Sequence, residues 1–110
     1  MKDNQYIQRL IKYCDKINDY MRPVNSFNEF ISKPEKVDAV ILNLEQIGET
    51  AKKLTKKTKE DYSEINWPSI IGLRNMISHE YEGIRLEIIY EISTRHIDAL
   101  KNNLKMVNRQ

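Results

Sequence analysis

The segment PEKVDAVILNLEQIGETAKKL, from Pro34 to Leu54, decides the fold class of this chain. Its apolar residues recur every three or four positions, which is the spacing of one face of an α-helix. They are Val37, Val40, Ile41, Leu44, Ile47, Gly48, Ala51 and Leu54. Pro34 suits the first turn of such a helix. The segment therefore predicts a long helix with one continuous apolar stripe.

Gly48 is unusual inside this stripe, because a glycine in a helix costs about 1 kcal/mol relative to alanine. We predict that a neighbouring helix approaches closely at Gly48, in preference to a catalytic role for the residue. A lysine run follows at the end of the same segment. Most such runs are solvated faces, but a patch that attracts phosphate is a second interpretation. The run comprises Lys52, Lys53, Lys56, Lys57 and Lys59.

The same periodicity predicts three further helices, over about residues 3–21, from Pro68 to Ile77 or a little beyond, and over about residues 85–108. Residues 26–31 suit a short helical turn, since Ser26 and Glu29 have the spacing of a capping box. Residues 58–66 are polar and are predicted to form the longest loop. The last helix should bury a seam at steps of three and four, formed by Leu86, Tyr90, Ser93, Ile97, Leu100, Leu104 and Val107.

The composition fits one small helical domain spanning residues 1–110. The chain has only three glycines and three prolines, too few turn formers for an all-β fold. We therefore predict an all-α, up-and-down bundle of four main helices. The net charge of +2 does not by itself indicate a nucleic-acid binder. A lone Cys14 forms no internal disulfide, and no run of residues is long and apolar enough for a membrane span, so we expect a soluble cytoplasmic protein with no membrane contact.

Arg74 falls on the predicted inward face of the third helix, a face defined by Trp67, Ile70, Ile71 and Ile77. An arginine in such a place needs an anion, a group of carbonyls or solvent in a cleft. Tyr81 lies only about 20° from the angular position of Arg74 on a helix, whereas His79 lies about 140° away. Arg74 and His79 therefore converge only if the helix ends or bends near Ser78, or if the partner group comes from another chain.

These residue types suit cleavage of RNA without a metal or another cofactor. A histidine with a pKa near 6.5 can take the proton of a ribose 2′-OH or give one to the 5′-oxygen leaving group. Arg74 can hold the phosphate, and Asn75 can orient the phosphate or the histidine. The spacing of His79 and His96 is not that of a helical metal site, so we predict no metal. The alternative is structural, with Arg74 paired to a core carboxylate and His79 at a helix end.

The string Arg74-Asn75-x3-His79-x-Tyr81 resembles the signature of HEPN domains, and most closely that of their HepT branch, the DUF86 family. Residues 44–54 (LEQIGETAKKL) and 67–75 (WPSIIGLRN) resemble two further stretches of that branch. The segment from Gly83 to Tyr90 is similar as well, although a tryptophan is commoner in the family where Tyr90 stands. The resemblance covers nearly the whole chain.

The resemblance implies a HEPN-like bundle that dimerises through the helices bearing the motif. It also implies a metal-independent endoribonuclease, the toxin of a type VII toxin–antitoxin pair of the HepT/MntA type. Arg74 and His79 match the catalytic pair of the family, and Asn75 matches its supporting polar residue. Tyr81 matches the tyrosine that a partner MntA-like minimal nucleotidyltransferase modifies with AMP, which would block the RNA phosphate site.

Two other functions remain open from the sequence. One is a non-catalytic helical partner, or a nucleotide-binding subunit, of a nucleotidyltransferase. The other is a plain helical interaction domain, in which Arg74 serves stability alone. The histidine favours the ribonuclease, while the weak net charge leaves room for the binding module.

Overall fold

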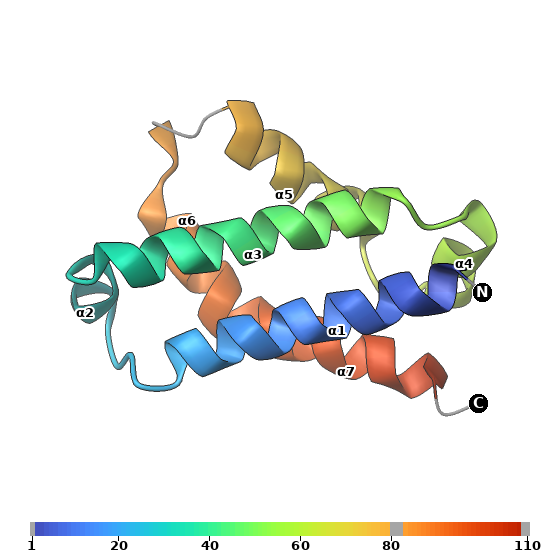
Figure 1. Ribbon diagram of the computed structural model, residues 1–110, viewed down its shortest axis with the longest axis horizontal. Helices are drawn as coiled ribbons and strands as arrows, with labels where there is room; N and C mark the ends of the chain where they lie inside the picture. The colour runs from blue at the N-terminus through green and yellow to red at the C-terminus, as the bar shows by residue number, and fades with distance from the viewer. Residues whose placement is uncertain (1, 80–82, 109–110) are drawn as a thin grey trace.

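Four helical rods run alternately up and down the long axis of the computed structural model (Figure 1). The first three are α1 (Lys2–Met21), α3 (Pro34–Lys52) and α5 (Trp67–His79). The fourth joins α6 (Leu86–Glu91), a π-helical turn η2 (Ile92–His96) and α7 (Ile97–Asn108). The structure describes residues 2–79 and 83–108, and the side chains of residues 3–77 and 83–106. This described part contains no strand, so the predicted all-α bundle is confirmed.

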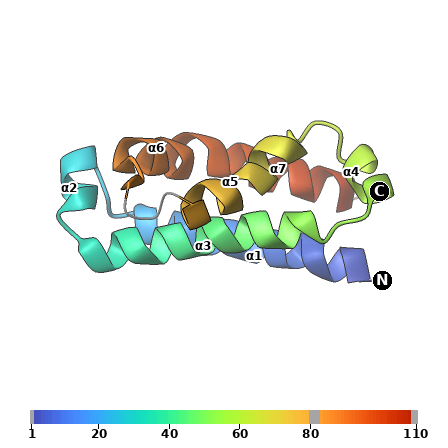
Figure 2. The ribbon, with the colours of Figure 1, turned by 90° about the horizontal axis from the view of Figure 1, so that it is seen from above.

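α3 occupies the middle of the bundle and packs against α1 and, most extensively, against α5. Seen from above, α5 lies between α3 and the fourth rod (Figure 2). All eight residues of the predicted apolar stripe are buried, and Leu44 and Ile47 are completely inaccessible. Burial of each such large side chain contributes roughly 1.5–3 kcal/mol relative to exposure. The stripe therefore holds both neighbouring helices onto α3.

The short helical turn is present as α2 (Phe27–Ile31). The Ser26 hydroxyl accepts a hydrogen bond from the Glu29 amide at 3.1 Å, as the capping-box spacing predicts. Phe30 is fully buried, and the rings of Phe27 and Phe30 both lie 5.7 Å from the ring of Tyr90. This aromatic group closes one end of the bundle.

The predicted loop over residues 58–66 is partly wrong, because α4 (Lys56–Asp61) occupies its first half. Thr55 caps α4 by accepting a hydrogen bond from the Thr58 amide at 3.3 Å. The hydroxyls of Thr55 and Thr58 both donate to the Asp3 carboxylate of α1, at 2.6 and 2.5 Å. These bonds lower the pKa of Asp3 from its usual value. A threonine cap and a partner 52 residues away thus order a segment whose polar composition suggested a loop.

The last predicted helix is interrupted where we expected continuity, since η2 inserts a turn of i to i+5 hydrogen bonds. Ile97 donates its amide proton to the Ile92 carbonyl in that pattern. The wide turn changes which residues face the core. Ile89 is completely buried in place of Leu86 and Tyr90, which are only partly buried. From Ser93 in the π turn onward the predicted seam is buried, at Ser93, Ile97, Leu100 and Leu104, while the side chain of Val107 lies outside the described residues.

Cys14 is a buried part of the core. Burial raises the pKa of its thiol to about 12, mainly because the thiolate would lose its hydration. The side chain therefore stays protonated and acts as a small apolar group.

Gly48 marks the closest approach between α3 and α5. A Cβ atom at this position would lie 2.8 Å from both the Cβ and the backbone nitrogen of Arg74. Such a contact is shorter than a side chain tolerates without a backbone shift. The prediction of a close helix approach is confirmed, and the neighbour is the residue singled out as catalytic.

We expect Gly48→Ala to lower the free energy of unfolding by on the order of 1 kcal/mol, despite the better helix propensity of alanine. The overpacking cost of about 1–3 kcal/mol exceeds the propensity gain of about 1 kcal/mol. Gly72→Ala in α5 is the matched control, because no atom lies within 4 Å of its added methyl group. That variant should gain stability. Urea unfolding of both variants tests the contact, and an equal gain for Gly48→Ala would contradict it.

Candidate functional site

α5 carries Arg74 at the boundary between its buried and its exposed face. Trp67, Leu73 and Ile77 are buried, whereas Ile70 and Ile71 are only partly so. The buried face of α5 is therefore rotated modestly from the predicted one. It includes Leu73, which the prediction left out. The Arg74 side chain is 37% exposed and follows the surface of α3. It does not enter the core.

The Arg74 guanidinium is held by an acidic side chain of α3. Its Nε donates to Oε1 of Glu49 in a short ion pair, and Nη1 lies 3.5 Å from the Asn75 side-chain oxygen. No other described residue accepts a hydrogen bond from this guanidinium. A guanidinium has five N–H groups. Several donors of Arg74 thus have no partner in the described part of the chain, and such donors suit an anion.

The structural alternative pairs Arg74 with a carboxylate in the core. The carboxylate found beside Arg74 belongs to Glu49, which is not in the core. Glu49 is 35% exposed, so neither partner is fully desolvated. Pairs of this kind contribute about 0–1 kcal/mol to stability. The pair orients the arginine more than it stabilises the bundle. Sequence reasoning missed Glu49, although its place directly after Gly48 was a usable signal once Arg74 was known to need an anion.

The other predicted residues are placed only in part. Asn75 is exposed beside Arg74. His79 is the last residue of α5, and its side chain lies outside the described residues. Tyr81 lies wholly outside them. α5 is helical through His79, so the helix does not end between Arg74 and His79. The two residues therefore keep an angular separation of about 140° around the helix axis.

The second histidine lies elsewhere. His96 belongs to η2 and lines a hollow of about 470 Å³ with Ile70 and Leu73 of α5. Its side chain is largely exposed and 4.0 Å from Glu91. In the part of the chain that the structure describes, no three histidine, cysteine or acidic side chains gather to hold a metal ion. No described helix has the length and apolarity needed to cross a membrane.

Comparison with known proteins identifies the family. A family model described as "Ribonuclease HepT-like" matches residues 10–107. The chain belongs to the HepT-like ribonuclease family. One relative, from Caldanaerobacter subterraneus subsp. tengcongensis, is named "Putative RNase TTE0752"; it is 30% identical over 93% of this chain and 90% of its own length. Another, "Probable ribonuclease HepT" of Thermococcus cleftensis, is 24% identical over 94% of each chain. No solved structure matches.

Arg74 and its partner Glu49 lie in two different stretches that resemble the HepT-like family. Arg74, Asn75 and His79 of the family-like signature belong to α5, and the segment that resembles the second-helix stretch of the family supplies Gly48 and Glu49. The two stretches meet at one point, where α3 and α5 touch. The sequence similarity and the geometry therefore single out the same place.

We expect Arg74→Ala to lower the free energy of unfolding by no more than about 1 kcal/mol, because the ion pair is partly exposed. Alanine also keeps the Cβ that lies against Gly48. Its neighbour Leu73 is buried, so Leu73→Ala should cost about 2–5 kcal/mol and is the control within the same helix. Thermal or urea unfolding gives both values. A loss for Arg74→Ala as large as that for Leu73→Ala would mean that the arginine is structural.

Proposed function

We propose that this HepT-like protein is a metal-independent endoribonuclease. The observation that carries the proposal is the Arg74 guanidinium, which Glu49 orients while most of its N–H groups have no partner among the described residues. These donors suit the equatorial oxygens of a phosphodiester, whose charge grows as the bond is cleaved. The "RNase" names of the relatives support the same activity.

His79 supplies the acid–base chemistry in this proposal. The ribose 2′-oxygen gives up its proton to a neutral imidazole and attacks the adjacent phosphorus. The bond from phosphorus to the 5′-oxygen then breaks, and an imidazolium can protonate that leaving oxygen. The products are a 2′,3′-cyclic phosphate and a 5′-hydroxyl. Because the nucleophile is the 2′-OH, the substrate is RNA and not DNA.

A homodimer would resolve the angle between Arg74 and His79. Side chains about 140° apart on one regular helix do not meet at a single phosphate on that helix. Two copies of α5 facing each other would bring groups from both chains to one cleft. We therefore propose that the active enzyme is a dimer formed through α5.

The protein would act as a toxin in this scheme, with a minimal nucleotidyltransferase of the MntA type as its antitoxin. Tyr81 follows Arg74 by seven residues and is the proposed site of AMP transfer. An AMP group there carries a negative charge and considerable bulk. Both properties would exclude an RNA phosphate from Arg74.

We expect the purified, unmodified protein to cleave RNA in the presence of EDTA. His79→Ala and Arg74→Ala should each lower the rate by about 10²–10⁴-fold, since an acid–base group or a charge-stabilising group is lost. Cleavage is followed on labelled RNA, with an all-DNA strand as the negative substrate. Ser69→Ala, on an exposed residue of the same helix, is the control. Intact RNA after long incubation with the wild type would instead support a non-catalytic binding module.

The antitoxin proposal has its own measurement. After co-expression with an MntA-like nucleotidyltransferase, the intact mass of the protein should increase by AMP groups. Tyr81→Phe should abolish the increase, because phenylalanine lacks the accepting hydroxyl. Tyr20→Phe, on an exposed tyrosine of α1, should leave the increase unchanged. Modification that persists in Tyr81→Phe would show that another residue is the acceptor.

A further inference from the structure

The lysine run at the end of α3 forms a surface of its own. We call Lys52, Lys53, Lys56, Lys57 and Lys59 the lysine track. None of the five forms an ion pair with a carboxylate among the described residues. Glu60 and Asp61 of the same segment and Asp3 of α1, which lies against α4, offset three of these five charges. This surface therefore carries a net positive charge.

An ordered scaffold carries the track. α4 is fastened to α1 at its start, where Thr55 and Thr58 donate to Asp3. Its end is fastened to α5, because the indole nitrogen of Trp67 donates to the carbonyls of Lys59 and Tyr62 at 3.0 and 3.2 Å. Charges on an anchored helix lose less conformational entropy on binding than charges on a free loop.

The track continues onto α1 through an aromatic ring. The Lys53 ammonium lies 5.9 Å from the centre of the Tyr6 ring, and the Arg9 guanidinium lies 5.6 Å from it. Lys53, Lys57 and Tyr6 also line a hollow of about 640 Å³ with Asp3 and Asp61. Asp3 stays ionised there, because the hydroxyls of Thr55 and Thr58 lower the pKa of its carboxyl group. The ring thus gathers cations from two helices at one hollow.

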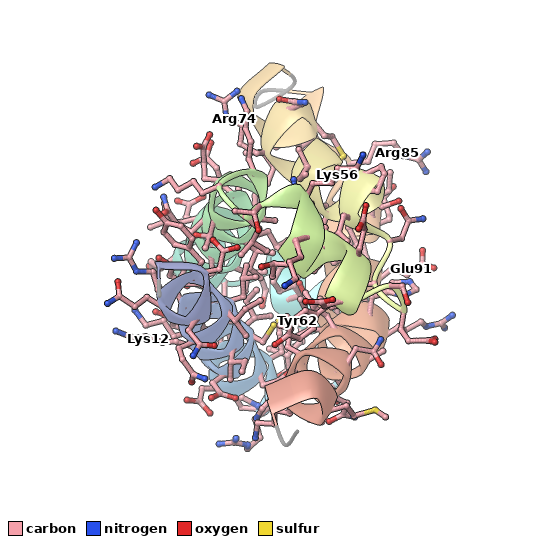
Figure 3. The ribbon with its side chains drawn as sticks, turned by 90° about the vertical axis from the view of Figure 1, so that its right-hand side faces the viewer. Lys12, Lys56, Tyr62, Arg74, Arg85 and Glu91 are labelled. Atoms are coloured by element: carbon pink, nitrogen blue, oxygen red, sulfur yellow. The ribbon has the colours of Figure 1, made fainter. Side chains whose placement is uncertain are left out.

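The track begins close to Arg74. Lys52 follows Gly48, the residue in contact with Arg74, by four positions, which is one helical turn or about 6 Å along α3. The view along the bundle shows Lys56 between Arg74 and Tyr62 in projection (Figure 3). Because Glu49 neutralises Arg74 locally, the arginine alone offers little net attraction to a polyanion. The attraction has to come from neighbouring charges.

We propose that the lysine track, with Arg9, binds the phosphates of a single-stranded RNA on one side of the bond that is cleaved. This inference rests on the ribonuclease activity proposed above and extends it from one phosphate to several nucleotides. RNA reaching Arg74 would pass over the end of α3 and along α4. Contacts with phosphate carry no sequence information, so the track sets affinity and direction and leaves base preference to other groups.

The test measures the salt dependence of RNA binding in His79→Ala protein, in which the RNA stays intact. Fluorescence anisotropy gives the Kd for a labelled RNA of 20 nucleotides at several salt concentrations. Each lysine–phosphate contact contributes about 0.7 to the slope of log Kd against log salt for a single strand. Lys53→Gln/Lys57→Gln should therefore lower that slope by about 1.4. Lys53→Arg/Lys57→Arg should restore it, which separates charge from any effect on folding.

Lys16→Gln/Lys36→Gln is the matched control, since it removes two charges of the same kind. Lys36 begins α3 at the end opposite to Lys52, about 24 Å away along the helix. The slope of log Kd against log salt for Lys16→Gln/Lys36→Gln should equal that of the parent His79→Ala protein. Equal slopes for the two glutamine variants would overturn the proposal and leave the lysines as a solvated face or a contact for an acidic protein.

A second readout separates this proposal from the ribonuclease itself. In the His79-containing protein, the ratio of kcat/KM for the 20-nucleotide RNA to kcat/KM for a dinucleotide should fall about tenfold in Lys53→Gln/Lys57→Gln. A dinucleotide has a single phosphodiester, which Arg74 would hold, so it has no further phosphate for the track. Absence of cleavage by the wild type would contradict the proposed ribonuclease function. The slopes measured in His79→Ala protein would still show whether the lysine track binds RNA phosphates.

Discussion

The contact between Gly48 and Arg74 is the constraint on which the rest of the structure depends. α3 and α5 approach so closely there that any side chain on residue 48 would strike the neighbouring backbone. The same contact places Arg74 beside Glu49 and fixes the direction of its guanidinium. The close helix packing and the arginine proposed to bind phosphate therefore lie at one position. α3 and α5 can pack closely because Gly48 has no side chain, and the Arg74 guanidinium is oriented because the Glu49 carboxylate lies next to it.

The hydrophobic pattern of the sequence was enough to predict most of the fold. Each long helix is apolar on one side only, so the positions of α1, α3 and α5 follow from periodicity, and Gly48 announced the close packing. α4 was missed because its stability comes from Asp3, a partner distant in the sequence. The π turn was missed because a pattern of threes and fours assumes a continuous α-helix. Both failures have tertiary or local geometric causes that periodicity does not record.

The candidate site was predictable in composition but not in arrangement. The order of Arg74, Asn75 and His79 can be read from the sequence, and the match over residues 10–107 shows the family in which their roles are proposed. The role of Glu49 could not be read in this way, since two helices must be placed before any pair across them is visible. The residue types of a candidate site can thus be predicted from the sequence, whereas the orientation of their side chains depends on how the helices pack.

The π turn at Ile92–His96 divides the last rod into two helices with separate angular settings. One additional residue in a turn rotates everything beyond it by about 100° relative to an uninterrupted α-helix. α6 can therefore match the aromatic end of the bundle, where Tyr90 meets Phe27 and Phe30, while α7 independently matches α1. The π turn thus sets the angular offset between α6 and α7, so that each of the two helices packs in its own orientation.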